Sequence, residues 1–333
     1  MAALVAAGLT AGTWTAAGAS APDFEVDPDA TVAIGIVLAP TSLDIIGQAG
    51  AALDQLLLDN VYETLTRYVD GEILPGLASG YTVSDDALTY TFTIQDGVTF
   101  HNGDPLTAAD VAYSLDQSRT EGVGNDSALL ADVESVEATD DSTVVVTLSQ
   151  PNIDFIWNLS RRAGVVVQDG STADDRLAAA IGTGPFLLTD FAAGESIALT
   201  RNDAYWGDAP QVGEIIFQFF GGDQNALVNA LSDGDIQIAV AVNTDLVGPF
   251  EDNPDFVISS GPTNGEFTLG LNNAEEALSN PLVRQAITHA IDRPAILDLF
   301  NGYGTVVGMP VPPMDPWYED IDPYPFDPER AKE

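Results

Sequence analysis

Hydrophobic and polar positions change their period twice between residues 86 and 115. Hydrophobic residues alternate with threonines from Leu88 to Ile94, which predicts a half-buried strand. Two turns rich in Asp, Asn and Gly follow, with a short strand at residues 98–100 between them. Thr107 then has the character of a helix N-cap, with Asp110 three residues on as its capping-box acid. The segment therefore predicts a strand, a turn, a second strand, a second turn and a capped helix.

The same patterning predicts alternating strands and helices in the rest of the chain. Residues 31–38 predict a buried first strand, and hydrophobic residues at helical spacing predict an amphipathic helix over residues 51–68. Later segments predict a hairpin over residues 133–148, a strand at residues 267–271, and a helix that starts at Pro281 with its hydrophobic face buried. This alternation is typical of an α/β fold in which helices cover a sheet.

Composition adds a strong bias of charge. The 333 residues suffice for two domains with a sizeable core, and they carry 51 acidic against 10 basic side chains, for a net charge of −41. A field of that sign disfavours binding to nucleic acids and to anionic membranes. Two explanations stay open: solubility, as in a salty habitat where cations screen the charge, or an acidic patch that collects cationic ligands.

Cysteine and histidine, which many catalytic and metal sites need, are absent or scarce. The sequence has no cysteine, and its only histidines are His101 and His289, which argues against disulfides, thiolate zinc sites and histidine-rich metal sites. Ser196 lies in a broken Gly-x-Ser-x-Gly pattern and has no plausible histidine partner. The Gly-x-Gly at residues 182–184 is followed by Pro185 and a strand instead of the helix of a nucleotide-binding loop. We therefore expect a protein that is not an enzyme and holds no cofactor or metal.

The N-terminal segment, residues 1–21, is apolar and ends in Ala-Ser-Ala, as a secretory signal does before its cleavage site. It lacks the basic start of such a signal, and an ordinary apolar segment is the alternative. Thr13 stands where a lipoprotein signal would need cysteine, so a lipid anchor is unsupported. No later segment reaches the roughly 18 uninterrupted apolar residues of a membrane span. The expected location is outside the cytoplasmic membrane, in a periplasm or on the outer cell surface.

The run FHNGDPLTAADVAYSL at residues 100–115, preceded by YTFTIQDGVT, resembles the signature of a known family. The family is solute-binding protein family 5, which serves the ABC importers of peptides and nickel. Further similar passages follow the family's order over residues 31–333; they are SLD (42–44), NVYETLTRYVDG (60–71), GTGPF (182–186), AYWG (204–207), GDIQIA (234–239), NPLVRQAITHAIDRPAILDLFNGYG (280–304) and the stretches 308–313 and 324–332. One departure is Ile45, where the family usually has proline.

The resemblance implies a periplasmic-binding-protein-like class II α/β fold, with two lobes of mixed sheets covered by helices. It implies four segments along the chain: 1–21 as a signal-like segment, 22–45 with 166–262 as the main sheet of the first lobe, 46–165 as a subdomain inserted in that lobe, and 263–333 as the hinge and the start of the second lobe. The family normally continues well beyond the Asp-Pro-Glu passage at residue 327. The second lobe is therefore expected to be incomplete in this chain, whose own binding of solute should be weak.

The resemblance also implies a function, namely capture of a di- or oligopeptide or a similar small solute between the lobes and delivery to a membrane permease. The first-lobe wall would come from the loop after the first strand, with Gln48, Ala49 and Ala51. The crossing segment between the lobes would supply further contacts, from Thr263, Asn264, Gly265 and Glu266. A second-lobe Asp that pairs with the peptide amine in relatives cannot be placed here; Glu266 as its substitute is a hypothesis, against a solvated hinge acid.

Alternatives to this function stay open. The same fold serves nickel chelates, oligosaccharides and opines. A secreted sensor or chaperone-like binder without a transporter is the alternative from another functional class. The expected partners are a small-molecule or peptide ligand and the ABC permease subunits, with no nucleic acid, and the expected state is a monomer.

Overall fold

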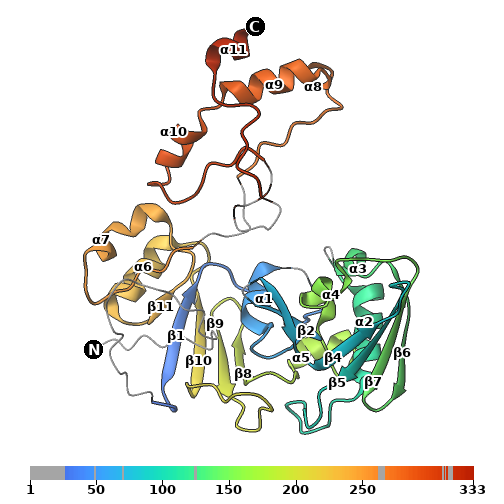
Figure 1. Ribbon diagram of the computed structural model, residues 1–333. Helices are drawn as coiled ribbons and strands as arrows, with labels where there is room; N and C mark the ends of the chain where they lie inside the picture. The colour runs from blue at the N-terminus through green and yellow to red at the C-terminus, as the bar shows by residue number, and fades with distance from the viewer. Residues whose placement is uncertain are drawn as a thin grey trace, which may run out of the picture. The chain divides into compact units, whose positions relative to one another are not determined.

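The computed structural model describes residues 27–48, 50–69, 71–123, 126–261, 267–309, 311, 313 and 318–333. The chain divides into two compact units, one that ends at Ala241 and one that begins at Val242 (Figure 1). All the strands that the structure describes lie in the first unit. No helix among the described residues is long and apolar enough to cross a membrane.

The main sheet of the first unit has five strands in a mixed arrangement. β1 lies between β10 and β11 and runs parallel to both, whereas β10, β9 and β8 are antiparallel neighbours (Figure 1). The spatial order is β11 (Ile238–Ala239), β1 (Thr31–Ile36), β10 (Glu214–Phe219), β9 (Ser196–Arg201) and β8 (Phe186–Ala192). Hydrophobic side chains that alternate along these strands form one of the unit's two cores. The predicted first strand is thus confirmed.

A second, antiparallel sheet of four strands holds the other core. Its order is β4 (Ala78–Val83), β5 (Thr89–Ile94), β7 (Thr143–Leu148) and β6 (Val133–Asp140), and helix α2 (Ala108–Glu121) packs against β6 and β7. A separate hairpin pairs β2 (Thr66–Val69) with β3 (Glu72–Pro75). The predicted strand before Asp96, the hairpin over residues 133–148 and the capping box of Thr107 with Asp110 are confirmed.

The remaining helices of the first unit are short, and one of them corrects a prediction. They are α1 (Ala51–Leu57), α3 (Asp126–Leu129), α4 (Phe155–Asn158), the 3-10 helix η1 (Arg162–Gly164), α5 (Ala173–Ala178) and α6 (Gln224–Asp233). The helix predicted over residues 51–68 is wrong after Leu57, because Leu58 is extended and Asp59 has a positive φ of 62°. Every residue from 61 to 66 is buried, so this stretch has no solvent face of the kind that an amphipathic helix needs.

The second unit consists of short helices and connecting segments in the part that the structure describes. The helices are η2 (Thr244–Leu246), α7 (Gly248–Glu251), α8 (Glu276–Ser279), α9 (Pro281–Ala290), α10 (Arg293–Asp298) and α11 (Pro328–Lys332). The predicted helix start at Pro281 is confirmed, and the side chain of Asn280 accepts the N–H of Leu282 at 2.9 Å.

Two predictions for the second unit are wrong. Residues 267–271 form no strand, and Phe267 is 92% exposed, because no other described segment of this unit pairs with them. The hydrophobic face of α9 is not buried either, since Leu282 stays 69% exposed. Both segments have the hydrophobic pattern of core elements, yet neither contains a buried residue.

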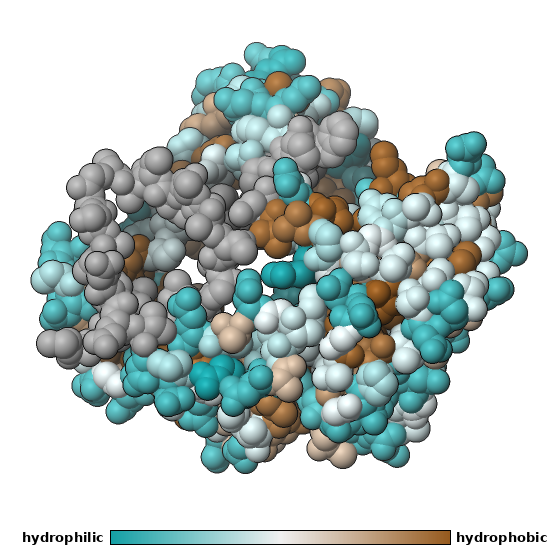
Figure 2. Space-filling view, turned by 60° about the horizontal axis from the view of Figure 1, so that its bottom comes forward, coloured by the Kyte–Doolittle hydropathy of each residue, from teal (hydrophilic) through white to brown (hydrophobic). Residues whose placement is uncertain are grey.

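The expected segment boundaries stay predictions. In the sequence, the boundary between the two units falls between Ala241 and Val242, whereas the expected end of the first lobe is residue 262. Within the first unit, β1 and β8 to β11 share the main sheet, and β4 to β7 form the other sheet. On the face shown in Figure 2, hydrophilic residues are spread widely and hydrophobic residues gather in patches between them.

Candidate functional site

The carboxyl ends of three parallel strands meet at one edge of the main sheet. The chain that follows β1 is held there by backbone hydrogen bonds, from the N–H of Gly222 to the carbonyl of Val37 at 2.9 Å and from the N–H of Phe220 to the carbonyl of Ile36 at 3.0 Å. The N–H of Val240, after β11, reaches the carbonyl of Gly35 at 2.9 Å. Ligands of open α/β sheets bind beside such carboxyl ends. A ligand site is therefore expected at this edge of the sheet.

A pocket of about 190 Å³ lies at this edge. We call it the β1 pocket. One side is the segment directly after β1 and the other is the loop that leads into α1; the lining residues are Leu38, Ala39, Pro40, Thr41, Ser42, Gln48, Gly50, Ala51, Ala52 and Leu53. Leu38 is 63% exposed, a high value for a leucine beside a pocket. Small and apolar residues with a few polar groups are what a small-molecule site requires.

The first side of the β1 pocket rests on a buried ion pair. Nε of Arg176 lies 2.7 Å from Oδ1 of Asp44, and both side chains are less than 5% exposed. The same Asp44 oxygen accepts the N–H of Ile46 at 3.2 Å, and the Asp44 N–H donates to Oγ of Ser42 at 3.1 Å. Asp44 therefore connects Ser42, a lining residue of the pocket, to α5 through its backbone N–H and its carboxylate.

The second side of the pocket is held by another arginine, Arg162 of η1. Its Nη1 donates to the carbonyl oxygen of Gln48 at 3.0 Å and to Oδ1 of Asp54, in α1, at 3.2 Å. Its Nε donates to Oδ2 of Asp126, the first residue of α3, at 2.6 Å. Burial raises the pKa of Asp54, and the positive charge of Arg162 opposes that shift. Three segments far apart in the sequence thus meet at one guanidinium.

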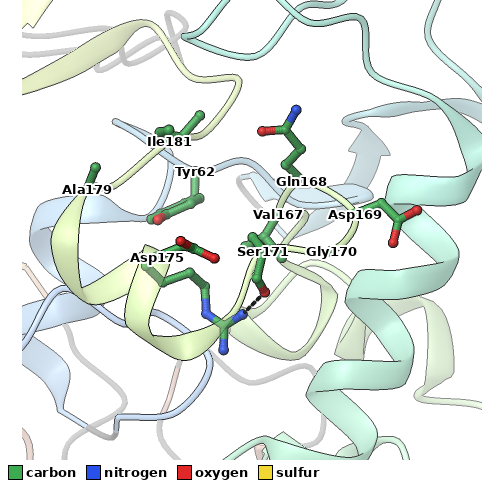
Figure 3. A pocket seen from close by; sticks show the side chains of 10 residues that line it. Tyr62, Val167, Gln168, Asp169, Gly170, Ser171, Asp175, Ala179 and Ile181 are labelled. Carbon is green, nitrogen blue, oxygen red and sulfur yellow. Dashed lines mark hydrogen bonds between the residues drawn. The ribbon is translucent and has the colours of Figure 1, made fainter.

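A second pocket, of about 310 Å³, lies beside α5 and is shown in Figure 3. We call it the α5 pocket; it is lined by Tyr62, Val167, Gln168, Asp169, Gly170, Ser171, Asp175, Arg176, Ala179 and Ile181. Two of its charged residues, Asp175 and Arg176, form hydrogen bonds within the fold. Asp175 accepts the N–H and the hydroxyl of Thr172 as the helix cap, at 2.9 and 2.7 Å. Arg176, besides its bond to Asp44, donates to the carbonyl of Ser171 at 2.8 Å, the dashed line in Figure 3.

A buried carboxylate explains two of the sequence motifs. Glu63 is 5% exposed and accepts three hydrogen bonds, from the hydroxyl of Thr183 at 2.9 Å, the hydroxyl of Tyr205 at 2.8 Å and the indole N–H of Trp206 at 2.8 Å. Burial raises the pKa of Glu63, and these three donors oppose the shift. The GTGPF and AYWG passages are therefore structural, because they clamp the chain at Glu63.

The glycines of GTGPF permit a close approach of backbone to backbone. A Cβ at Gly182 would lie 1.9 Å from the carbonyl oxygen of Val61, and one at Gly184 would lie 2.4 Å from that of Asn60. The imidazole of His101 joins the same loop, since its Nδ1 accepts the N–H of Gly182 at 3.3 Å and its Nε2 faces the carbonyl of Gly184 at 3.0 Å. Packing accounts for this Gly-x-Gly.

The structure brings together two of the predicted site residues. Gln48 and Ala51 both line the β1 pocket and are exposed. Ala49, Thr263, Asn264, Gly265 and Glu266 lie outside the described residues, so their roles stay predictions. The opposite side of the pocket, residues 38–42, was missed as a site. The sequence does contain a signal for this side, because the SLD passage that resembles the family starts at Ser42, shortly after the first strand.

Acidic residues are numerous, yet they do not gather into a metal site in the part of the chain that the structure describes. No group of three or more Asp, Glu, His or Cys side chains there could hold a metal ion.

Comparison with known proteins identifies the family. The model of the "Bacterial extracellular solute-binding proteins, family 5 Middle" matches residues 72–333. The chain belongs to this family. Glutathione-binding protein GsiB of Pectobacterium atrosepticum is 29% identical over 337 residues, which cover 99% of this chain and 64% of GsiB. GsiB of Salmonella typhi is 29% identical over 312 residues, which cover 92% of this chain and 60% of its own.

Solved structures of similar proteins confirm the fold. DppA of Helicobacter pylori in complex with the peptide STSA has a TM-score of 0.78 at 26% identity, with 91% of this chain and 65% of DppA covered. AgaA of A. tumefaciens R10 in complex with agropinic acid has a TM-score of 0.76 at 31% identity, with 91% and 63% covered. The fold is thus that of class II periplasmic binding proteins. The chain spans less than two thirds of the length of these relatives, whose names and titles describe binding proteins.

Proposed function

We propose that this family 5 protein is the substrate-binding component of an ABC importer, which captures a peptide or a similar small solute and delivers it to a membrane permease. The observation that carries the proposal is the β1 pocket at the carboxyl edge of the parallel strands of a family 5 fold. Apolar residues would pack against the solute, and Gln48, Thr41 and Ser42 would supply polar contacts.

Relatives support the ligand class. GsiB is named for glutathione and DppA was solved with the peptide STSA, whereas AgaA was solved with agropinic acid. A peptide is the solute that the proposal favours, and Thr263, Asn264, Gly265 and Glu266 would contact it from the crossing segment.

Export and the permease complete the proposal. The family model describes extracellular proteins, and the apolar segment at residues 1–21 would direct this protein through the membrane. The protein would act there as a monomer and pass its solute to the permease subunits, without catalysis.

The test is native mass spectrometry of the full-length protein isolated from its own cells, with two matched variants. Ala51→Trp fills the β1 pocket and Ala179→Trp fills the α5 pocket, and both alanines are exposed at the surface. We expect the wild type and Ala179→Trp to retain a peptide-like solute and Ala51→Trp to lose it. Retention by Ala51→Trp would contradict the site.

The permease needs a separate test. A protein that retains solute and copurifies with permease subunits after cross-linking supports the importer. Retention without a permease partner would favour a secreted sensor.

A further inference from the structure

Basic side chains are scarce in this protein, and two of them lie almost out of contact with solvent. The sequence has 10 basic against 51 acidic residues, so every base is surrounded by potential partners. The side chains of Arg176 and Arg162 are only 3% and 10% exposed. Burial of a charge costs free energy unless the charge is paired and hydrogen-bonded. Both arginines bind residues in or next to the two segments that line the β1 pocket.

Arg176 acts on the first wall through Asp44. The loop curls closely round this carboxylate, because a Cβ at Gly47 would lie 2.3 Å from its Oδ2. Asp44 in turn fixes the hydroxyl of Ser42, which lines the pocket, through its backbone N–H. The side chain of Glu121 lies 3.9 Å from Nη2 of Arg176 and adds a weaker attraction.

Arg162 acts on the second wall directly. Its Nη1 binds both the Gln48 carbonyl and the carboxylate of Asp54, so the loop and the helix that line the pocket share one donor atom. Its Nε is bound by Asp126, whose side chain is 13% exposed, at 2.6 Å. The planar guanidinium can meet these three acceptors at once, whereas the single ammonium of a lysine presents a point charge.

The wall has little order of its own. Helix α1 has seven residues, its N-cap is Gly50, and no side chain caps its first turn. A helix of that length is marginal in water, so tertiary contacts must hold it in place. The bonds from Arg162 are contacts of this kind, and they come from outside the loop.

We propose that Arg162 is a positioning residue that fixes one wall of the β1 pocket, the loop at Gln48 and helix α1, before solute arrives. This inference rests on the proposed function, because it concerns the same site. A wall that is already ordered does not lose conformational entropy on binding, so its rigidity adds to affinity.

The test compares Arg162→Lys with a matched control, Arg201→Lys. Arg201 also binds two carboxylates, those of Asp29 and Asp203, and a backbone carbonyl, that of Pro28. Its side chain is 20% exposed. Two of its partners, Pro28 and Asp29, precede β1 and the third, Asp203, follows β9, whereas the pocket follows β1. Three quantities are measured in each protein: the melting temperature, amide hydrogen exchange without ligand over residues 44–57, and the dissociation constants for glutathione and for the peptide STSA.

We expect Arg162→Lys to speed exchange at residues 44–57 by about tenfold and to weaken binding of the better probe by about tenfold, with a melting temperature close to that of Arg201→Lys. Arg201→Lys should leave exchange in this segment and affinity unchanged. A purely structural role would lower the melting temperature of Arg162→Lys without any change in affinity.

Two outcomes separate this inference from the proposed function. If the wild type binds neither probe and retains no solute, the proposed function fails, while exchange in the ligand-free protein still shows whether Arg162 orders the wall. If the wild type binds a probe and Arg162→Lys matches Arg201→Lys in exchange and affinity, the positioning role is overturned.

Discussion

A single buried carboxylate, that of Glu63, joins three segments that are far apart in the sequence. Thr183, Tyr205 and Trp206 all donate to it, and the chain around Glu63 passes between the two cores of the first unit. Burial raises the pKa of this group, so its charged form is disfavoured. The three donors, more than the charge, give Glu63 its role in stability.

Two substitutions of Glu63 should therefore differ sharply. Glu63→Gln keeps one oxygen for Thr183 and Trp206, and its amide can donate to a reoriented Tyr205 hydroxyl, so we expect a loss of less than about 1 kcal/mol. Glu63→Leu leaves one buried and two partly buried donors without their acceptor and should cost about 3 kcal/mol. Urea unfolding measures both values. Equal losses in the two variants would contradict this account.

His101 makes the first unit sensitive to mild acid. Burial lowers the pKa of His101 below its ordinary value, and its Nδ1 accepts a hydrogen bond, which a protonated ring cannot do. Below the unfolded pKa of about 6.5 the unfolded chain binds more protons at this residue than the folded chain does. The stability that neutral His101 contributes is thus present above that pH and is lost as the pH falls.

The prediction is a smaller acid-induced loss of stability in His101→Gln than in the wild type. Melting temperatures measured from pH 7.5 to 5.5 should fall less steeply in this variant, whatever its stability at pH 7.5. His289→Gln is the control, because His289 lies in the second unit and contacts Pro325. A wild-type slope in His101→Gln would contradict the role of His101.

At the scale of elements, helices α2 and α9 differ in how many of their residues are buried. Six residues of α2 are buried, whereas none of α9 is. Both helices start with a capping side chain and both have a hydrophobic face. Their difference lies in what packs against that face, and amide protection follows packing.

We expect amides of α9 to exchange at least about tenfold faster than amides of α2 in the same sample. Hydrogen exchange resolved by mass spectrometry provides the comparison, with the exposed α11 as a reference for a helix without protection. Equal protection of α9 and α2 would contradict the exposed state of the α9 face.

Elements with a complete local signal could be predicted from the sequence. Strand β5 and the capping box of Thr107 depend on neighbours in the sequence, and both were predicted correctly. The helix predicted after Leu57 is wrong because the residues of this stretch are buried on all sides. Their hydrophobic positions alone fit the spacing of a helix, so the pattern could not tell the two cases apart. At the site, Gln48 and Ala51 were predicted by family resemblance, but Arg162 was not. Its partners lie 36 to 114 positions away in the sequence, and no local pattern reports such contacts.

At the scale of the whole molecule, the net negative charge is expected to affect the stability of the folded state. A net charge of −41 repels itself, and the compact state feels this repulsion more than the unfolded chain does. Salt shortens the screening length from about 30 Å at 0.01 M to about 3 Å at 1 M. Screening should therefore stabilise the folded protein.

The melting temperature should rise by several degrees between 0.01 M and 1 M NaCl, and KCl should act equally. Differential scanning calorimetry measures the change, with sucrose of matched osmolality as the control for effects other than screening. A melting temperature that falls with salt, or rises only with one cation, would contradict repulsion as the cause.

The central claim is that solute binds at the β1 pocket. Hydrogen exchange of the first unit with and without the retained solute tests it most directly, because bound solute slows exchange in the segments that it contacts. We expect slower exchange at residues 38–42 and 48–53 and no change at residues 167–181 beside the α5 pocket. Protection centred on residues 167–181, or bound solute without protection at residues 38–53, would contradict it.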